Sequence, residues 1–115
     1  MTIKLKPTWT EEQIAQAYKK ADDLTKAETV VTKSPVTRDA NLRSKFKKAG
    51  GEINERQQVD HIVDLQLGGT NAMTNLQALD ASVNASFGVQ IKNQIKNLPD
   101  NTRVNNVYIK SIVKE

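Results

Sequence analysis

The middle of this chain contains the pattern that most restricts its fold. Residues 57–67 are rich in aliphatic side chains and predict a strand or extended segment that ends near His61 and runs into a loop. Residues 68–71 (Gly-Gly-Thr-Asn) predict a tight, omega-like turn, because glycine permits backbone conformations that other residues avoid. Residues 75–80 (NLQALD) predict a second short strand, and a helical pattern over residues 82–97 follows. The segment therefore predicts two strands and a helix.

The predicted helix begins after Asp80 or Ser82, either of which can act as its N-cap. Two stripes of side chains repeat every four residues along it. The core stripe is Val83, Phe87, Ile91 and Ile95, and the polar stripe beside it is Asn84, Gly88 and Lys92. Because glycine disfavours helix, we interpret Gly88 as a place where a ligand approaches the helix between its polar neighbours; the alternative is that it relieves packing against a neighbouring element.

The flanking segments predict two further helices and a strand. Thr10 and Gln13 form a capping-box pattern before an amphipathic helix over residues 11–27. A second helix is expected over residues 38–49, stopped by two glycines, with Leu42, Phe46 and Ala49 facing inward. A final strand is expected over residues 104–113, with Val107, Ile109 and Val113 on one face.

A chain of 115 residues predicts a single α+β domain with one modest core. We expect a helical N-terminal part over residues 1–56, the strand-strand-helix unit over residues 57–97, and a C-terminal strand part over residues 98–115. The chain has no cysteine, which excludes disulfides and thiolate zinc sites. No apolar run is long enough to span a membrane and no signal peptide is visible, and we expect a monomer.

Charge is unevenly distributed along the chain. Residues 37–56 carry six Lys or Arg against three Asp or Glu, whereas residues 57–100 carry two against four. A basic flank beside an acidic centre is typical of a protein that attracts phosphates at its rim, although an ordinary solvated face gives the same pattern. The candidates for contact with a nucleic-acid backbone are Arg43, Lys45, Lys47 and Lys48.

The stretch from Val59 to Gly88 reads VDHIVDLQLGGTNAMTNLQALDASVNASFG. It places an Asp-His pair before the glycine turn, then Asn75, then Asn84 nine positions later. This spacing resembles the HNH/endonuclease VII superfamily of nucleases, whose site is a ββα unit that holds one divalent metal. Because the third motif residue is an asparagine here, the pattern is an H-N-N variant.

The resemblance implies a role for each motif residue. His61 is the general base, since a neutral imidazole can accept the proton of an attacking water near neutral pH. Asp60 and Asn84 are the metal ligands, and Asn75 braces the loop and the histidine. A carboxylate and an amide oxygen suit Mg²⁺, with Mn²⁺ next and Zn²⁺ or Ni²⁺ less favoured without a histidine on the helix. Lys92 is expected to contact phosphate or to stabilise charge during cleavage.

The order Asp60, His61, Asn75, Asn84, Lys92 also fits an Asp-His-Asn-Asn-Lys signature of toxin domains at the C-terminal tips of bacterial polymorphic toxins, which include Rhs-type, type VI secretion and contact-dependent inhibition effectors. That resemblance implies a DNase that a secretion system delivers into the target-cell cytoplasm. It also implies neutralisation by a cognate immunity protein.

Three alternatives remain open from the sequence. The same site could cleave RNA such as tRNA, because it acts on a phosphodiester rather than a base. The chain could be a phage or recombination nuclease of the same superfamily. It could also be a noncatalytic nucleic-acid-binding or protein-binding module that retains only the scaffold.

Overall fold

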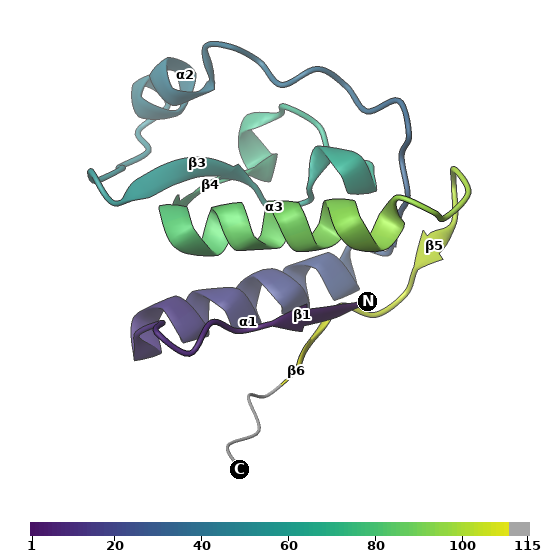
Figure 1. Ribbon diagram of the computed structural model, residues 1–115. Helices are drawn as coiled ribbons and strands as arrows, with labels where there is room; N and C mark the ends of the chain where they lie inside the picture. Colours follow the sequence, from purple (N-terminus) through teal and green to yellow (C-terminus); the bar gives the residue numbers. More distant parts are fainter. Residues whose placement is uncertain (111–115) are drawn as a thin grey trace.

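The computed structural model describes residues 1–110, which form three α-helices, two short 3₁₀ turns and six strands in three two-stranded sheets (Figure 1). The helices are α1 (Glu11–Lys26), α2 (Leu42–Lys48) and α3 (Ala81–Ile95). The strands are β1 (Thr2–Lys4), β2 (Thr29–Val30), β3 (Gln57–His61), β4 (Leu76–Asp80), β5 (Arg103–Val104) and β6 (Tyr108–Lys110), and the 3₁₀ turns are η1 (Leu65–Leu67) and η2 (Met73–Asn75). The described chain is one small α+β domain, as the sequence predicts.

Strands β3 and β4 form an antiparallel hairpin that leads directly into α3. The register pairs Asp60 with Gln77 and His61 with Leu76, so β3 ends at the histidine as expected. Asp80 caps α3, because its carboxylate accepts hydrogen bonds from the amides of Ser82 and Val83. The strand-strand-helix order of the middle segment is therefore confirmed.

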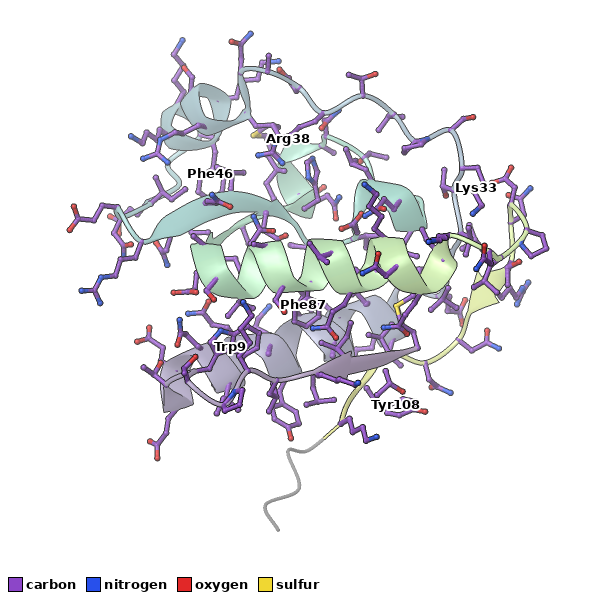
Figure 2. The ribbon with its side chains drawn as sticks, viewed as in Figure 1. Trp9, Lys33, Arg38, Phe46, Phe87 and Tyr108 are labelled. Atoms are coloured by element: carbon purple, nitrogen blue, oxygen red, sulfur yellow. The ribbon has the colours of Figure 1, made fainter. Side chains whose placement is uncertain are left out.

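The hairpin lies between two layers of helix. On one side α1 and α3 run side by side and enclose the main core, with Phe87 of α3 turned toward α1 (Figures 1 and 2). On the other side α2 covers a smaller cluster of Leu42, Val59 and Leu76, with Phe46 at its edge. The predicted core stripe of the third helix is confirmed, since Val83, Phe87, Ile91 and Ile95 are all buried.

The N-terminal helix is confirmed with its cap. Thr10 accepts a hydrogen bond from the amide of Gln13, and the Gln13 side chain accepts one from the amide of Thr10. The second helix is shorter than predicted and begins at Leu42. Residues 39–42 form a turn instead, because the Asp39 carboxylate and carbonyl accept hydrogen bonds from the amides of Asn41 and Leu42. The prediction that Ala49 faces inward is wrong, since it is exposed after the helix ends.

The ends of the described chain lie together. Strand β1, which the sequence did not predict, pairs in parallel with β6. The predicted final strand is interrupted: β5 and β6 are separated by an irregular segment, and Val107 within it is buried. The predicted inward position of Val113 lies outside the described residues. In residues 1–110, no helix has the length and apolar character needed to cross a membrane.

Candidate functional site

A cavity of about 480 Å³ opens at the end of the β3–β4 hairpin. It is lined by residues 35–38, the last two residues of β3, the turn at residues 64–66, and Asn84 in the first turn of α3. Asp60, His61 and Asn84, which the sequence assigns to one site, all line this cavity, and Arg38 lines it with them. The fold therefore brings the predicted base and both predicted metal ligands to one hollow.

Asp60 and His61 reach the cavity from opposite faces of the hairpin. Neighbouring side chains alternate along a strand, so Asp60 points toward α1 and His61 toward the segment before α2. Both can line one cavity because His61 is the last residue of β3, where the strand gives way to a loop. This is the strand-end arrangement that a shared site requires.

A buried ion pair fixes the carboxylate of Asp60. The Lys20 ammonium lies 2.7 Å from Asp60 Oδ2, and the side chains are only 1% and 6% exposed. The same ammonium donates to the carbonyl of His61 at 3.0 Å and lies 5.7 Å from the centre of the Phe87 ring. Gln77 Nε2 also donates to Asp60 Oδ2, at 2.9 Å.

Both hydrogen bonds to Asp60 within the described residues therefore reach the same oxygen, Oδ2. No buried side-chain nitrogen or oxygen in that part of the chain lacks a partner. Oδ1 of Asp60 is consequently not fully closed to solvent, and Asp60 is among the residues that line the cavity.

Two side chains hold the imidazole of His61. Asn71 Nδ2 donates to the carbonyl of Thr37 at 2.8 Å, which turns Asn71 Oδ1 toward the imidazole. His61 Nε2 lies 2.9 Å from that oxygen and must carry the proton, because an amide oxygen only accepts. In the neutral ring the lone pair is then on Nδ1, to which Arg38 Nη1 donates at 3.4 Å. Nδ1 is thus the ring nitrogen at which a neutral His61 can accept a proton.

Asn75 holds the loop between the two strands rather than the imidazole itself. Its Oδ1 accepts from the amide of Val63 at 2.8 Å, and its Nδ2 donates to the carbonyls of Val63 and Thr70 at 3.0 and 2.8 Å. Its carbonyl accepts from the amide of Ile62 at 2.7 Å. The side chain therefore fixes the residues that directly follow His61.

The glycine turn needs both glycines, for different reasons. Gly68 has a φ of +92°, which side chains with a Cβ rarely adopt. Gly69 has no room for a side chain, since a Cβ atom there would lie 1.7 Å from the carbonyl oxygen of Val63. The predicted tight loop is confirmed.

Only one member of the polar stripe of α3, Asn84, lines the cavity. It donates from Nδ2 to Gln58 Oε1 at 2.8 Å, so its Oδ1 remains available as an acceptor. Lys92 is exposed two turns further along the helix and does not line the cavity. No neighbouring atom lies within 4 Å of a Cβ added at Gly88, so close packing does not require this glycine.

The four basic residues predicted to contact nucleic acid lie on α2 and are exposed. Lys45 differs from the others because its ammonium forms an ion pair with Asp39. The hydrogen bond from Lys45 and another from the amide of Asn41 lower the pKa of the Asp39 carboxyl below its ordinary value. Lys45 is thus less free to contact a phosphate than Arg43, Lys47 and Lys48.

Two side chains that line the cavity, Asp60 and Asn84, carry oxygen atoms that can bind a metal ion. No cluster of three or more His, Cys, Asp or Glu residues suited to a metal occurs in residues 1–110. Asp60 Oδ1 and Asn84 Oδ1 are two oxygen donors beside open space, and Mg²⁺ accepts few protein ligands while keeping several waters. The residues present therefore fit Mg²⁺.

Sequence reasoning missed three residues of this site: Lys20, Arg38 and Asn71. A signal was present for Lys20, since it falls on the apolar stripe of α1 with Ala17, Ala21 and Leu24, where a lysine must bury its charge. Arg38 and Asn71 lie in irregular segments, where periodicity carries no information about neighbours.

Comparison of the chain with protein-family models, with curated proteins and with solved structures found no match.

Proposed function

We propose that this protein is an endonuclease that hydrolyses DNA phosphodiester bonds with little sequence preference and uses a divalent metal, with Mg²⁺ as the best fit. The observation that carries the proposal is the shared cavity of Asp60, His61 and Asn84 at the mouth of a β-hairpin and its following helix. A general base and two oxygen donors beside one open volume are what hydrolysis of a phosphodiester needs.

His61 takes the proton of the attacking water at Nδ1, while Asn71 holds the protonated Nε2 and so fixes the tautomer. Asp60 and Asn84 would hold the metal through their Oδ1 atoms, and Lys20 keeps the carboxylate in place. The metal, when bound, would stabilise the charge on the phosphoryl oxygens and on the leaving alkoxide. Asn75 keeps the loop after the histidine in one conformation.

The biological setting is part of the same proposal. The Asp-His-Asn-Asn-Lys resemblance supports a toxin domain that a bacterial secretion system delivers and that an immunity protein neutralises. Expression of the chain in bacterial cells, alone or with the reading frame next to its gene, tests this setting. Toxicity that the neighbouring product relieves supports it, and harmless expression of a cleavage-competent chain contradicts it.

Nicking of a supercoiled plasmid tests the activity. We expect cleavage with Mg²⁺ or Mn²⁺, none with EDTA, and none by His61→Ala, whose Mn²⁺ binding should persist because neither proposed ligand is changed. Asn93→Ala is the matched control, since Asn93 is exposed on α3 and does not line the cavity. Undiminished nicking by His61→Ala would contradict the nuclease assignment. The assignment would also fail if the unaltered protein cleaved neither DNA nor RNA with any of the metals tested.

The same series with total RNA in place of the plasmid decides the substrate. Cleavage of RNA alone, lost in His61→Ala, would retain the site and replace DNA by RNA as its substrate.

A further inference from the structure

The cavity has one cationic side chain on its wall among the described residues, and it is Arg38. The other charged side chains that line it are Asp60 and Asp64. The charge of Asp60 is already balanced by Lys20, which lies buried behind it. An anion that enters the cavity therefore meets the Arg38 guanidinium as its nearest available positive charge.

The Arg38 guanidinium also lies against Nδ1 of His61, the atom through which the proposed base would accept a proton. Its Nη1 lies 3.4 Å from His61 Nδ1, and its Nη2 donates to the carbonyl of Val59 at 3.2 Å. Because His61 Nε2 donates to Asn71, Nδ1 holds the lone pair that would accept a proton. In this structure that lone pair faces the Arg38 guanidinium.

Neither contact of Arg38 is strong. The contact with His61 is long at 3.4 Å, and the contact with Val59 is at the upper end of the ordinary range at 3.2 Å. Both acceptors are neutral, and Arg38 is exposed. A guanidinium binds a phosphate more strongly than it binds a neutral acceptor, because that hydrogen bond is charge-assisted and often bidentate. A phosphate beside His61 would thus draw the guanidinium away from Nδ1.

We propose that Arg38 binds the scissile phosphate of the nucleic acid, and that this binding uncovers His61 Nδ1. The inference rests on the proposed nuclease function and assigns to Arg38 the phosphate contact that the sequence assigns to Lys92. Since Arg38 covers the base only before the phosphate arrives, its loss weakens binding and leaves the chemical step intact.

Equilibrium binding in EDTA tests the phosphate contact without any cleavage. The probe is a short DNA duplex, measured over a series of salt concentrations. Arg38→Gln should bind the duplex about tenfold to a hundredfold more weakly, which is the range expected for a lost charged hydrogen bond. The dependence of its binding constant on salt concentration should weaken by the equivalent of about one phosphate contact. The matched control is Arg103→Gln, since Arg103 is exposed on β5 and lines a separate hollow near the N-terminus. Equal losses in the two variants would overturn the proposal.

Steady-state cleavage with Mg²⁺ tests the uncovering of the base. In Arg38→Gln we expect KM to rise in proportion to the binding loss, while kcat stays within about threefold of the unaltered protein. A lower kcat at unchanged KM would mean that Arg38 positions His61 instead, and it would overturn the proposal. Equal urea midpoints for Arg38→Gln and the unaltered protein show that the variant folds. Arg38→Lys keeps the positive charge but loses the two parallel N–H donors of the guanidinium, so its affinity for the duplex should lie between those of Arg38→Gln and the unaltered protein.

These outcomes are separable from the proposed function itself. If the unaltered protein cleaves no nucleic acid, the nuclease assignment fails. If it cleaves and Arg38→Gln behaves like Arg103→Gln, only the role of Arg38 fails.

Discussion

The Lys20 ammonium and the Asp60 carboxylate form an ion pair 2.7 Å long that is almost closed to water. The pair joins α1 to the hairpin strand β3, and the same ammonium also binds the carbonyl of His61. A buried charge is expensive unless a partner of opposite sign and further hydrogen bonds accompany it. The helical N-terminal half is thus a structural part of the candidate site and not only a cover for it.

Removal of the ammonium should strongly destabilise the fold. In Lys20→Met the Asp60 carboxylate stays buried without its counter-charge, and we expect a loss of about 3–5 kcal/mol in the free energy of unfolding. Urea denaturation measures this loss. The control is Lys19→Met, because Lys19 is 67% exposed and pairs with Asp23 at the surface, where we expect less than about 1 kcal/mol.

The double variant Lys20→Met/Asp60→Leu separates charge from packing. It removes both charges and fills the volume with apolar groups, so it should recover most of the stability lost in Lys20→Met. A double variant no more stable than Lys20→Met would show that the ion pair is not what the single change disturbs.

The local pattern of the sequence predicts most of the regular structure. Periodicity and capping residues place α1, α3 and the hairpin, because those signals act over a few residues of chain. Strand β1 escapes this reasoning, since three residues carry no period and its pairing with β6 joins opposite ends of the described chain. The second helix was predicted too long because Asp39 binds the backbone of its own turn, which periodicity does not detect.

The candidate site is predictable only where its residues share one motif. Asp60, His61 and Asn84 fall within a single segment, and the fold brings them to one cavity. Lys20 reaches Asp60 across 40 positions, and Arg38 reaches His61 across 23. Contacts over such distances are set by how helices pack on the hairpin, and no local pattern encodes them.

Asn71 should control the activity of His61 without touching the substrate cavity. In Asn71→Ala the imidazole loses the acceptor that fixes its tautomer, and we expect kcat to fall by about tenfold to a hundredfold, as for other groups that orient a catalytic histidine. Plasmid nicking rates measure the effect. Asn71→Asp keeps an acceptor at Nε2 but loses the donor to Thr37, so it should retain more activity than Asn71→Ala. Equal rates in both variants would contradict a role through Nε2.

The Lys45–Asp39 pair gives a prediction about pH. The pKa of Asp39 is lowered in the folded protein, so the pair contributes stability above the ordinary carboxyl value of 3.8 and loses it as pH falls through the folded pKa. In Lys45→Met the pKa of Asp39 should rise toward its ordinary value, as carboxyl NMR shifts will show. Lys47→Met is the control, since the structure pairs Lys45 and not Lys47 with Asp39. A rise in both variants would mean that general charge on α2, and not this contact, sets the pKa.

Alanine at two glycines should change stability in opposite directions. At Gly69 the new Cβ would overlap the carbonyl of Val63, so the loop after His61 must shift, and we expect a loss of more than about 3 kcal/mol. At Gly88 the new Cβ meets no neighbour within 4 Å, and alanine favours helix, so we expect a gain of about 0.5–1 kcal/mol. Urea denaturation of the two variants measures both effects.

The Gly88→Ala variant also tests whether substrate approaches α3 at this glycine. A methyl group that stabilises the free protein but obstructs the nucleic acid should slow cleavage and weaken binding of the DNA duplex. Because the fold is at least as stable as before, a slower rate cannot come from unfolding. Unchanged cleavage by the more stable variant would show that the substrate does not contact this part of the helix, and the glycine would then have no role in binding.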